Sequence, residues 1–502
     1  MASPPRRLRR VLSAAAAVVA VAAATAVNTA AAAAARGGST PPPPWKDAAL
    51  RRAACGAGYP GAVTPPGYCA YTAASGLAGP RGIAVDAAGD LLVVERFRPH
   101  KGRIRSYHLP PWAVRTGLPG RLRAVTLVPA DETINLNHGV AVHGGFLYAS
   151  NDTSVFRWPY KAGQRRLIGN HRRQVVIDGM PGGIVFRHYT RTLKFNAAGD
   201  LFMSIGSRQT DGVDGTPWRS MVKRYPAAVV AKWSAPRAAP LHWQRGQTWA
   251  LGLRNEVGLA FDGAGVLWGV ENGNNLVKDP RLGGDVTDDN PCEEINRLDK
   301  PGAFFGYPYC WSEGVLPAPR KSVTGRQHAW FPFTAPARPG KPRKKFRGTP
   351  ITNEFCRNPS RVVPPAACLP AHWAPLGMAF QPPPPPTGAK GAAARRRRRY
   401  EFPASGSGDA IVLSHGSFSR VPAVGYSVAR VRYAGGAPVT GGRGASGVAV
   451  IPEVLFGSAT AAAGNVTFPN GFRPLDGLFW TDGSFAFTGD KTGEIVLLRY
   501  YW

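Results

Sequence analysis

Histidine, arginine and asparagine side chains recur directly before short aliphatic segments of this 502-residue sequence. An imidazole can accept a proton near neutral pH, and a guanidinium can bind an anion through two parallel hydrogen bonds. One such residue alone is more often structural, so their recurrence at similar positions is what indicates a site. These residues are Asn137 and His138, His188, Arg254 and Asn255, His372, and Arg473.

The aliphatic segments share one pattern, in which a strand, a glycine-containing turn and a second strand follow one another. Alternating strands around tight turns form β-hairpins. In the fifth copy, a Pro- and Arg-rich segment at 381–407 separates GMAF from GDAIVLS. The six copies begin at Gly82 (GIAVDAAGDLLVV), Gly139 (GVAVHGGFLYAS), Arg191 (RTLKFNAAGDLFMS), Gly258 (GLAFDGAGVLWGV), Gly377 (GMAF) and Gly477 (GLFWTDGSFAFTG).

Six hairpins predict an all-β protein with a six-bladed β-propeller, which buries the sheet faces against neighbouring blades. A β-sandwich with a second β domain is the alternative. In a propeller, the first strand of each hairpin lines the central channel. The polar residues that precede these strands should therefore meet at the mouth of the channel.

The N-terminal residues have the organisation of an export signal. Residues 1–35 combine a basic segment, an alanine-rich apolar segment and A-x-A cleavage sequences, so we expect a signal peptide there. We expect a linker and an N-terminal disulfide loop at 36–75, and the propeller at 76–502. No second apolar run approaches the length of a membrane span. These features predict a secreted protein, extracellular or periplasmic, without stable membrane insertion.

The six cysteines fall into three neighbouring pairs along the chain. An even number of cysteines in an exported chain favours disulfides. None of the pairs has the C-x-x-C spacing of a zinc site, so we expect no zinc site. Spacing does not determine the connectivity, and pairing between neighbours is the simplest hypothesis. The neighbours are Cys55 and Cys69, Cys292 and Cys310, and Cys356 and Cys368.

The formal net charge of +32 raises the question of an anionic partner. The basic residues are scattered, apart from the runs at 340–347 and 395–399 within Pro-, Gly- and Ala-rich sequence. No nucleic-acid-binding motif accompanies them, so we expect no nucleic acid as a partner. An anionic surface or a polysaccharide remains a candidate contact for the basic loops.

Several motifs resemble the glucose/sorbosone dehydrogenase family, with interruptions, from about residue 76 to the end. The most specific are HYTRTLKFNAAGDLFMSIGS and the stretch from Arg254 to Glu313; the others include LNHGVAV, HWAPLGMAF, HGSFSR and GEIVLLRY. Members of that family are exported six-bladed propellers that oxidise sugars with pyrroloquinoline quinone (PQQ) and calcium. The resemblance therefore implies a sugar substrate, both cofactors and an external electron acceptor.

The resemblance also implies roles for individual residues. His188 matches the general base, which takes the hydroxyl proton while hydride leaves the sugar for the quinone. Arg254 and Asn255 match a pair at the edge of the cofactor, where the guanidinium stabilises charge on the quinone oxygens. Gly273 and Asn274 match a turn whose backbone carbonyls help to hold calcium.

The remaining matches concern the acidic groups of the cofactor. Asn137 matches a polar residue near the cofactor, and Arg473 matches one of two arginines that bind its carboxylates. The neighbouring sequence PLD lacks the second arginine. Where the family has a lysine, this chain has SHGSFSR, which leaves His415 or Arg420 as the substitute.

Two other functions are compatible with the same fold. One is a calcium-dependent propeller hydrolase such as a lactonase, in which a metal-bound water reacts. The other is a catalytically silent propeller that binds glycans or protein partners. An acidic segment could either chelate calcium or form a solvated loop pinned by Cys292; it contains Asp285, Asp288, Asp289, Glu293 and Glu294.

Overall fold

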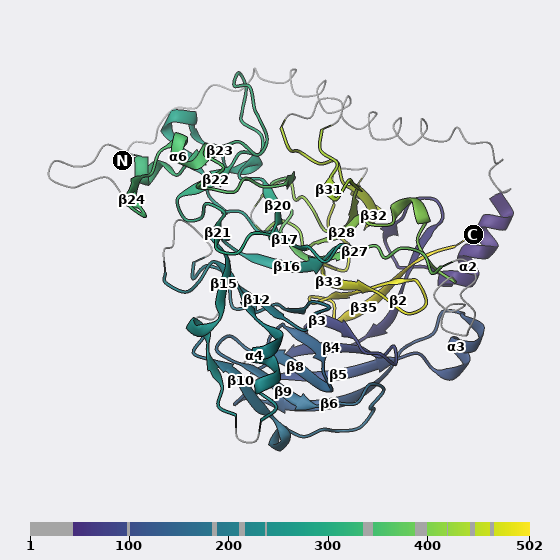
Figure 1. Ribbon diagram of the computed structural model, residues 1–502. Coiled ribbons are helices and arrows are strands. Elements are labelled where there is room, and N and C mark those ends of the chain that lie inside the picture. Colours follow the sequence, from purple (N-terminus) through teal and green to yellow (C-terminus); the bar gives the residue numbers. More distant parts are fainter. Residues whose placement is uncertain are drawn as a thin grey trace, which may run out of the picture. The chain divides into compact units, whose positions relative to one another are not determined.

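Strands dominate the computed structural model (Figure 1), which describes residues 44–97, 101–182, 188–209, 216–235, 238–334, 345–386, 399–418, 420–441, 447–461 and 466–501. The predicted signal peptide lies outside these residues, as do most of the two basic runs and much of the 381–407 insert. No helix among the described residues is long and apolar enough to cross a membrane.

Each of the first three blades begins with one of the predicted hairpins. Blade one contains β3 (Pro80–Val85), β4 (Leu91–Phe97), β5 (Lys101–His108) and β6 (Arg123–Asp131). Blade two contains β7 (Val140–His143), β8 (Phe146–Ser150), β9 (Val155–Pro159) and β10 (Gln174–Asp178), with β14 (Leu241–His242) at its edge. Blade three contains β11 (Leu193–Phe195), β12 (Leu201–Ile205), β13 (Met221–Tyr225) and β15 (Gln247–Leu251), with β21 (Ala303–Phe304) at its edge.

The last three blades follow the same plan. Blade four contains β16 (Glu256–Phe261), β17 (Leu267–Glu271), β20 (Glu293–Arg297) and β26 (Ala367–Leu369). Blade five contains β27 (Pro375–Phe380), β28 (Ala410–Ser414), β29 (Ser427–Val431) and β32 (Glu453–Ser458), with β1 (Ala62–Val63) at its edge. Blade six contains β33 (Pro474–Phe479), β34 (Phe485–Gly489), β35 (Glu494–Tyr500) and β2 (Tyr68–Ser75).

The innermost strands form a closed ring. In chain order, β3, β7, β11, β16, β27 and β33 each contact the next, and β33 contacts β3. This arrangement confirms the predicted six-bladed propeller. The fifth hairpin also forms as predicted, because β27 pairs with β28 across the insert.

Glycine at the start of a copy has a steric reason. A Cβ on Gly82 would collide with the carbonyl of His138, and a Cβ on Gly139 would collide with the carbonyl of Arg191. Each of these carbonyls belongs to the segment that enters the next blade. The glycines therefore allow neighbouring blades to approach closely beside the channel.

The propeller includes residues that we expected to be linker. Strand β2 pairs with β35 from Tyr68–Tyr500 to Ser75–Glu494, so it completes blade six rather than preceding the propeller. Strand β1 extends blade five through Ala62–Ser458. Regular strand structure thus begins before residue 76, since two segments from the N-terminal part add outer strands to blades that the C-terminal part builds.

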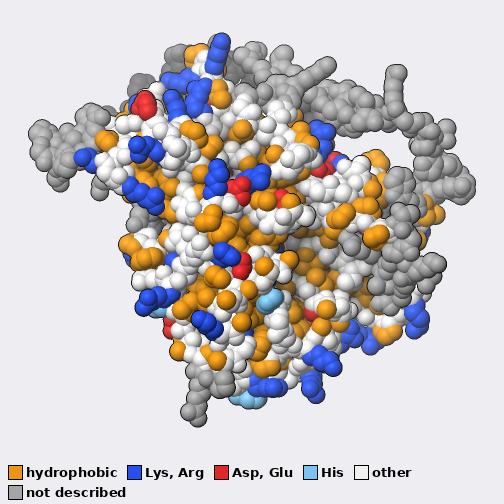
Figure 2. Space-filling view, viewed as in Figure 1, with side chains coloured by type: hydrophobic (Ala, Val, Ile, Leu, Met, Phe, Trp, Pro, Cys, Tyr) orange, Lys and Arg blue, Asp and Glu red, His pale blue; other side chains and the backbone are white. Residues whose placement is uncertain are grey.

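Short elements connect the blades. The helices are α2 (Pro44–Cys55), α3 (Pro111–Thr116), α4 (Ala227–Lys232), α5 (Phe331–Thr334) and α6 (Asn353–Arg357). The small two-stranded sheets are β18 (Lys278–Asp279) with β19 (Gly284–Asp285), β22 (Cys310–Ser312) with β23 (Gln327–Ala329), β24 (Lys345–Phe346) with β25 (Thr349–Pro350), and β30 (Tyr433–Ala434) with β31 (Ala437–Pro438). In Figure 2, Lys and Arg side chains are spread over the visible face.

Only one of the three expected disulfides is correct. Cys55 pairs with Cys69 as predicted, whereas Cys292 pairs with Cys368 and Cys310 pairs with Cys356. The neighbour hypothesis is wrong for the last two because packing between elements, and not distance along the chain, decides the contact: Cys310 lies on β22 and Cys356 on helix α6, which packs against β23. Residue 292 directly precedes β20, and Cys368 lies on β26, the next strand of the same blade.

Candidate active site

His188 and Asn255 approach each other closely, on segments that enter blades three and four. Gly206, just after β12, lies between them: a Cβ there would collide with Asn255 Oδ1 and lie 2.9 Å from His188 Cβ. Arg254, the neighbour of Asn255, accepts a 2.6 Å hydrogen bond at its carbonyl from the Ser207 amide. The structure thus brings His188 next to Arg254 and Asn255, which lie 66 and 67 positions further along the sequence.

Hydrogen bonds define which nitrogen of His188 can act as a base. His188 Nδ1 lies 2.9 Å from Ser207 Oγ. The single hydroxyl proton of Ser207 is donated to the Gln209 carbonyl at 2.7 Å. Ser207 Oγ therefore accepts from Nδ1–H, which leaves Nε2 as the basic nitrogen of the neutral ring.

The surroundings of His188 favour the neutral ring. Burial lowers the pKa of His188 well below its ordinary value, and the positive charges of Arg254 and Arg219 lower it further. A hydrogen bond to the Ser207 backbone acts in the opposite direction but is smaller. His188 is thus uncharged and able to accept a proton at neutral pH.

Arg254 is held by backbone carbonyls of the turn after β17. Its Nη1 donates to the Asn272 carbonyl at 2.8 Å and also to the Gly273 carbonyl. Its amide donates to Glu271 Oε1 at 2.5 Å. Two carbonyl oxygens of the predicted calcium turn therefore converge on one cationic nitrogen.

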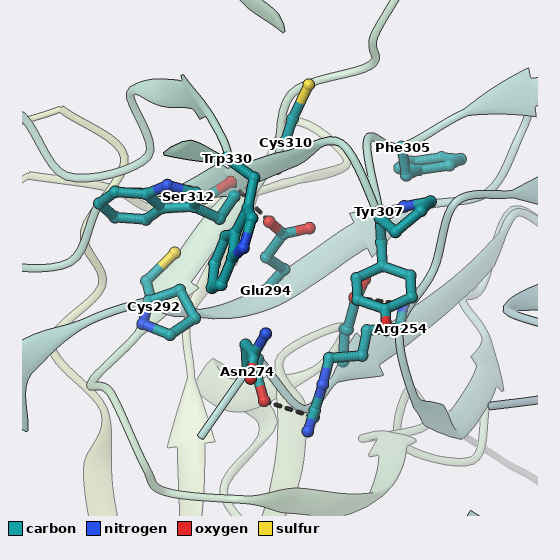
Figure 3. Close-up of a pocket in the computed structure, with 14 residues that line it drawn as sticks. Arg254, Asn274, Cys292, Glu294, Phe305, Tyr307, Cys310, Ser312 and Trp330 are labelled. Carbon is teal, nitrogen blue, oxygen red and sulfur yellow. Dashed lines mark hydrogen bonds between the residues drawn. The ribbon is translucent and has the colours of Figure 1, made fainter. Parts of the chain in front are cut away.

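A small cavity lies beside Arg254, and Figure 3 shows its lining. Asn274 and Glu294 supply polar groups, while Trp330 and Tyr307 supply aromatic faces. The cavity volume of about 30 Å³ corresponds to one or two water molecules, which is too little for a sugar ring. Neither His188 nor Asn255 lines this cavity, so it lies on the blade-four side of the candidate site.

Asn137 occupies the corresponding position before blade two. Its Nδ2 donates to the Tyr189 carbonyl at 3.1 Å, next to His188 in the chain. Its Oδ1 is buried and has no hydrogen-bond partner among the described residues. A buried oxygen without a donor is costly, so Asn137 offers an acceptor to a bound molecule.

Charged residues from blades one, five and six form a second group. Arg81 Nη1 lies 2.7 Å from Asp490 Oδ2, and His415 Nε2 lies 3.0 Å from Asp490 Oδ1. Arg473 donates to the carbonyls of His415 and Gly416 at 2.7 and 2.6 Å. Burial raises the pKa of Asp490, but its interaction and hydrogen bond with His415 and the positive charges of Arg81 and Arg473 outweigh this effect and hold the pKa below its ordinary range.

Arg420 has a different environment from His415, the other candidate for the lysine position. Arg420 donates to the Asp288 carbonyl and to Asp289 Oδ1, both at 2.7 Å. His372 Nε2 lies 2.7 Å from the Thr287 carbonyl of the same acidic loop. The structure therefore places Arg420 and His372 against this loop, and it brings His415 rather than Arg420 into the group around Asp490.

The acidic segment has two parts with different environments. Asp285, Asp288 and Asp289 belong to an exposed loop, whereas Glu293 and Glu294 are buried on β20. Among the described residues, no group of three or more His, Cys, Asp or Glu side chains is arranged to hold a metal ion.

Glu293 connects the turn after β17 in blade four to the entry to blade five. It accepts a 2.6 Å hydrogen bond from the Gly273 amide and a 3.3 Å bond from the Ala374 amide. Burial raises the pKa of Glu293 to about 7, although these hydrogen bonds oppose the increase. This carboxyl group thereby fixes the turn that carries the predicted calcium ligands.

Three further carboxyl groups surround one amide inside blade four. Asn296 Nδ2 lies 3.2 Å from Glu256 Oε2, 3.2 Å from Glu271 Oε2 and 3.3 Å from Glu294 Oε2. Ser312 donates to Glu294 Oε1 at 2.5 Å. An amide has only two N–H groups, so it cannot satisfy three ionised carboxylates. Burial raises the pKa of Glu294 to about 7 and those of the other two well above their ordinary value.

A family model described as TrAA12-like matches residues 62–501 of the chain. The chain belongs to this family. The match begins at β1 and includes all six blades, and it confirms the resemblance to PQQ-dependent sugar dehydrogenases that the motifs indicate.

Two curated relatives have activities in their names. The chain is 28% identical over 454 residues to a pyrroloquinoline quinone-dependent pyranose dehydrogenase of Coprinopsis cinerea, across 84% of this chain and 52% of the relative. It thus spans about half the length of that relative. It is 26% identical over 465 residues to a pyrroloquinoline quinone-dependent sugar dehydrogenase of Hypocrea jecorina, across 88% of this chain and 90% of the relative.

Solved structures support the same fold. A calcium structure of the Trichoderma reesei carbohydrate-active enzyme family AA12 has a TM-score of 0.67 at 25% identity, across 88% of this chain and 98% of the other. The holo PQQ domain of the Coprinopsis cinerea pyranose dehydrogenase has a TM-score of 0.65 at 22% identity, across 87% of this chain and 97% of the other.

The TrAA12-like site has features that fit PQQ, a quinone with three carboxylates. Arg81, Arg254 and Arg473 supply positive charge from three blades, and Asn137 supplies an unsatisfied buried acceptor. Calcium prefers oxygen ligands, and the Gly273 carbonyl belongs to a pair that already converges on a cationic nitrogen. These cationic groups and the unsatisfied Asn137 oxygen therefore fit PQQ, and the backbone carbonyls of the Gly273 turn are of the ligand type that calcium prefers.

Sequence reasoning missed four residues of this TrAA12-like site: Arg81, Asp490, Arg191 and Arg219. Arg81 directly precedes Gly82, at the position that His138 has before Gly139, so the repeat could have indicated it. Arg191 starts the one copy that does not begin with glycine, which is also a signal. Asp490 follows β34, the second strand of blade six, and Arg219 lies in the connection before β13. The repeat gives no information at either position.

Proposed function

We propose that this chain is a PQQ-dependent sugar dehydrogenase in which His188 is the general base. The observation that carries the proposal is the partly buried His188 imidazole, which lies close to Asn255 and next to the positive charge of Arg254, on segments that enter blades three and four. The names of the two curated relatives support a sugar as the substrate class. An external electron acceptor then completes the reaction cycle.

In this proposal His188 takes the proton of the sugar hydroxyl at Nε2. Ser207 keeps the ring in the required tautomer, because its hydroxyl accepts from Nδ1–H. When bound, PQQ would accept the hydride that leaves the sugar carbon bearing this hydroxyl. Neither residue has to reorganise its hydrogen bonds before the proton moves, which keeps the reorganisation cost low.

The cofactor would be held through its charged edge. Arg254 and Asn255 lie beside His188 and would bind the quinone side, with Asn137 as a further polar contact. Arg473 and Arg81 would face its carboxylates, and Asp490 holds Arg81 in place through the 2.7 Å ion pair.

Calcium belongs to the proposal through the Gly273 turn. The calcium structure of the AA12 enzyme supports this assignment. The carbonyl of Gly273 and the adjacent Asn274 would hold the ion, while the 2.6 Å hydrogen bond to Glu293 fixes the turn. Arg254 would have to release the Gly273 carbonyl, since one oxygen cannot face both cations at close range.

We also propose that the protein is exported, with residues 1–35 as the signal peptide and strands of the propeller starting at β1. Three disulfides among the described residues are consistent with an oxidising compartment. Arg420 binds Asp288 and Asp289 of the acidic loop. In this proposal it would act on the cofactor only indirectly, through that loop.

The test is reconstitution with calcium and PQQ, followed by a dye-reduction assay with a panel of aldoses. We expect activity that requires both additions. His188→Gln should lower kcat by about 100-fold or more, because a positioned base contributes at least this factor. His171→Gln, at an exposed histidine of a short 3-10 turn, is the matched control and should leave kcat unchanged.

Four outcomes would contradict the proposal. Absence of PQQ binding in a fluorescence titration would refute the assignment of PQQ as the cofactor. Unchanged activity of His188→Gln would refute the role of His188 as the general base. Lactone hydrolysis by the calcium-loaded protein without PQQ would favour the hydrolase alternative, and binding of glycans without any turnover would favour the silent propeller.

A further inference from the structure

A completely buried arginine, Arg191, follows His188 in the segment that enters blade three. Arg191 has 0% exposure and donates from Nη1 to the carbonyls of His188 and Thr190, at 3.2 and 2.8 Å. Its Nη2 donates to the carbonyls of Asp152 and Pro181, both at 2.9 Å. One guanidinium thus connects segments of blades two and three at four backbone points.

A second buried arginine binds two of the same carbonyls. Arg219 Nη2 donates to the His188 carbonyl at 2.9 Å and to the Ser207 carbonyl at 3.4 Å, and Nη1 donates to the Pro181 carbonyl. Arg219 therefore contacts both His188 and the residue that accepts from His188 Nδ1. With Arg191, it places two positive charges on one peptide segment.

Backbone carbonyls accept hydrogen bonds from the Nη groups of both arginines. Two like charges in a buried region repel each other, and burial together with Arg219 lowers the pKa of Arg191 to about 9. Asp152 is the negative group that acts on Arg191. The two arginines create a positive potential at His188, which neutral side chains in their place would not create.

We propose that Arg191 and Arg219 are positioning residues that fix the His188 segment and keep its imidazole in the uncharged, proton-accepting form. The proposal rests on the proposed role of His188 as the base. The charged groups that face His188 are Arg254 from the entry to blade four, Arg219 from the segment before β13, and Arg191 from the entry to blade three. All three are positive, and the neutral Ser207 is the hydrogen-bond partner.

The charge of Arg219 can be separated from its geometry with two substitutions. Arg219→Gln removes the charge, whereas Arg219→Lys retains it but loses the forked hydrogen bonds. We would follow the imidazole nitrogens by two-dimensional NMR over pH 4 to 8, roughly the range of histidine titration. The His188 signal is identified by its loss in His188→Gln, and the measurement needs no cofactor.

We expect the His188 titration midpoint to rise by about half a pH unit or more in Arg219→Gln, since a nearby like charge is removed. The midpoint in Arg219→Lys should stay within about 0.2 pH units of the original, because the charge remains. In the PQQ-loaded enzyme, the acid limb of kcat/KM should move with the midpoint in Arg219→Gln. Arg219→Lys should lower kcat without moving that limb.

An unchanged midpoint in Arg219→Gln would overturn the proposal, and so would a raised midpoint in Arg219→Lys. If Arg219→Gln does not fold, the Lys variant alone decides through the same two readouts. The NMR result is independent of turnover. A shifted midpoint in a protein that never oxidises sugars would refute the proposed function but not the electrostatic role of Arg219.

Discussion

The buried carboxyl groups of blade four should make the stability of the protein fall as pH rises. Glu256, Glu271 and Glu294 surround Asn296, and burial raises all three pKa values. Folding therefore favours their protonated forms. For such groups, the unfolding free energy is greatest below the pKa of the unfolded chain and decreases up to the pKa of the folded state.

The size of the effect can be estimated for Glu294. Its pKa moves from 4.5 to about 7, which corresponds to about 3 kcal/mol at 1.36 kcal/mol per pH unit. Glu294 alone should therefore lower the unfolding free energy by about 3 kcal/mol between pH 4.5 and 7, with little further change above. Glu256 and Glu271 should add to the loss in the same direction.

Urea unfolding at pH 5 and pH 8 tests this estimate. Glu294→Gln keeps the shape and an acceptor for Ser312 but cannot ionise, so it should lose about 3 kcal/mol less than the original protein between these pH values. Glu132→Gln is the control, because Glu132 is exposed and pairs with Lys101 on the surface. Equal pH dependence in the original protein and Glu294→Gln would refute the reasoning.

Three further predictions concern the site and the disulfides. Gly206→Ala should separate His188 from Asn255 and lower kcat by about 10-fold to 100-fold, measured as dye reduction by the PQQ-loaded enzyme; unchanged kcat would show that the close approach has no role. Replacing Cys292 and Cys368 by serine opens a 76-residue loop and should lower the unfolding free energy by about 4 kcal/mol, seen in urea unfolding. Chelation of calcium should abolish PQQ-dependent activity, and calcium should restore it better than magnesium, because carbonyl ligands suit the larger ion.

The repeat made much of the fold predictable from the sequence. Alternating strands around tight turns depend on local interactions, so all six hairpins form as expected, including the one with the insert in blade five. The positions of His188 and Arg254 followed from the same repeat. In contrast, the partner of Cys292 depends on which strand lies next in blade four, and that of Cys310 depends on where helix α6 packs; no local pattern encodes either arrangement.

The polar network around the site was less predictable for a related reason. Arg219 lies outside the repeat, and it donates to the backbone carbonyls of Pro181, His188 and Ser207, which no side-chain pattern in the sequence indicates. Asp490 pairs with Arg81 over more than 400 positions, since blade six closes against blade one. Such contacts exist only after the ring has formed.

The pairing of β2 with β35 has a consequence for biosynthesis. The two strands are separated by about 420 residues, from Ser75 to Glu494. At about 5 to 20 residues per second, β2 waits about 20 to 80 seconds before its partner is made. Cys69 on β2 can join Cys55 during that time, so the first disulfide forms on a strand that has not yet entered any sheet. The seven-residue strand β35 then joins β2 to blade six.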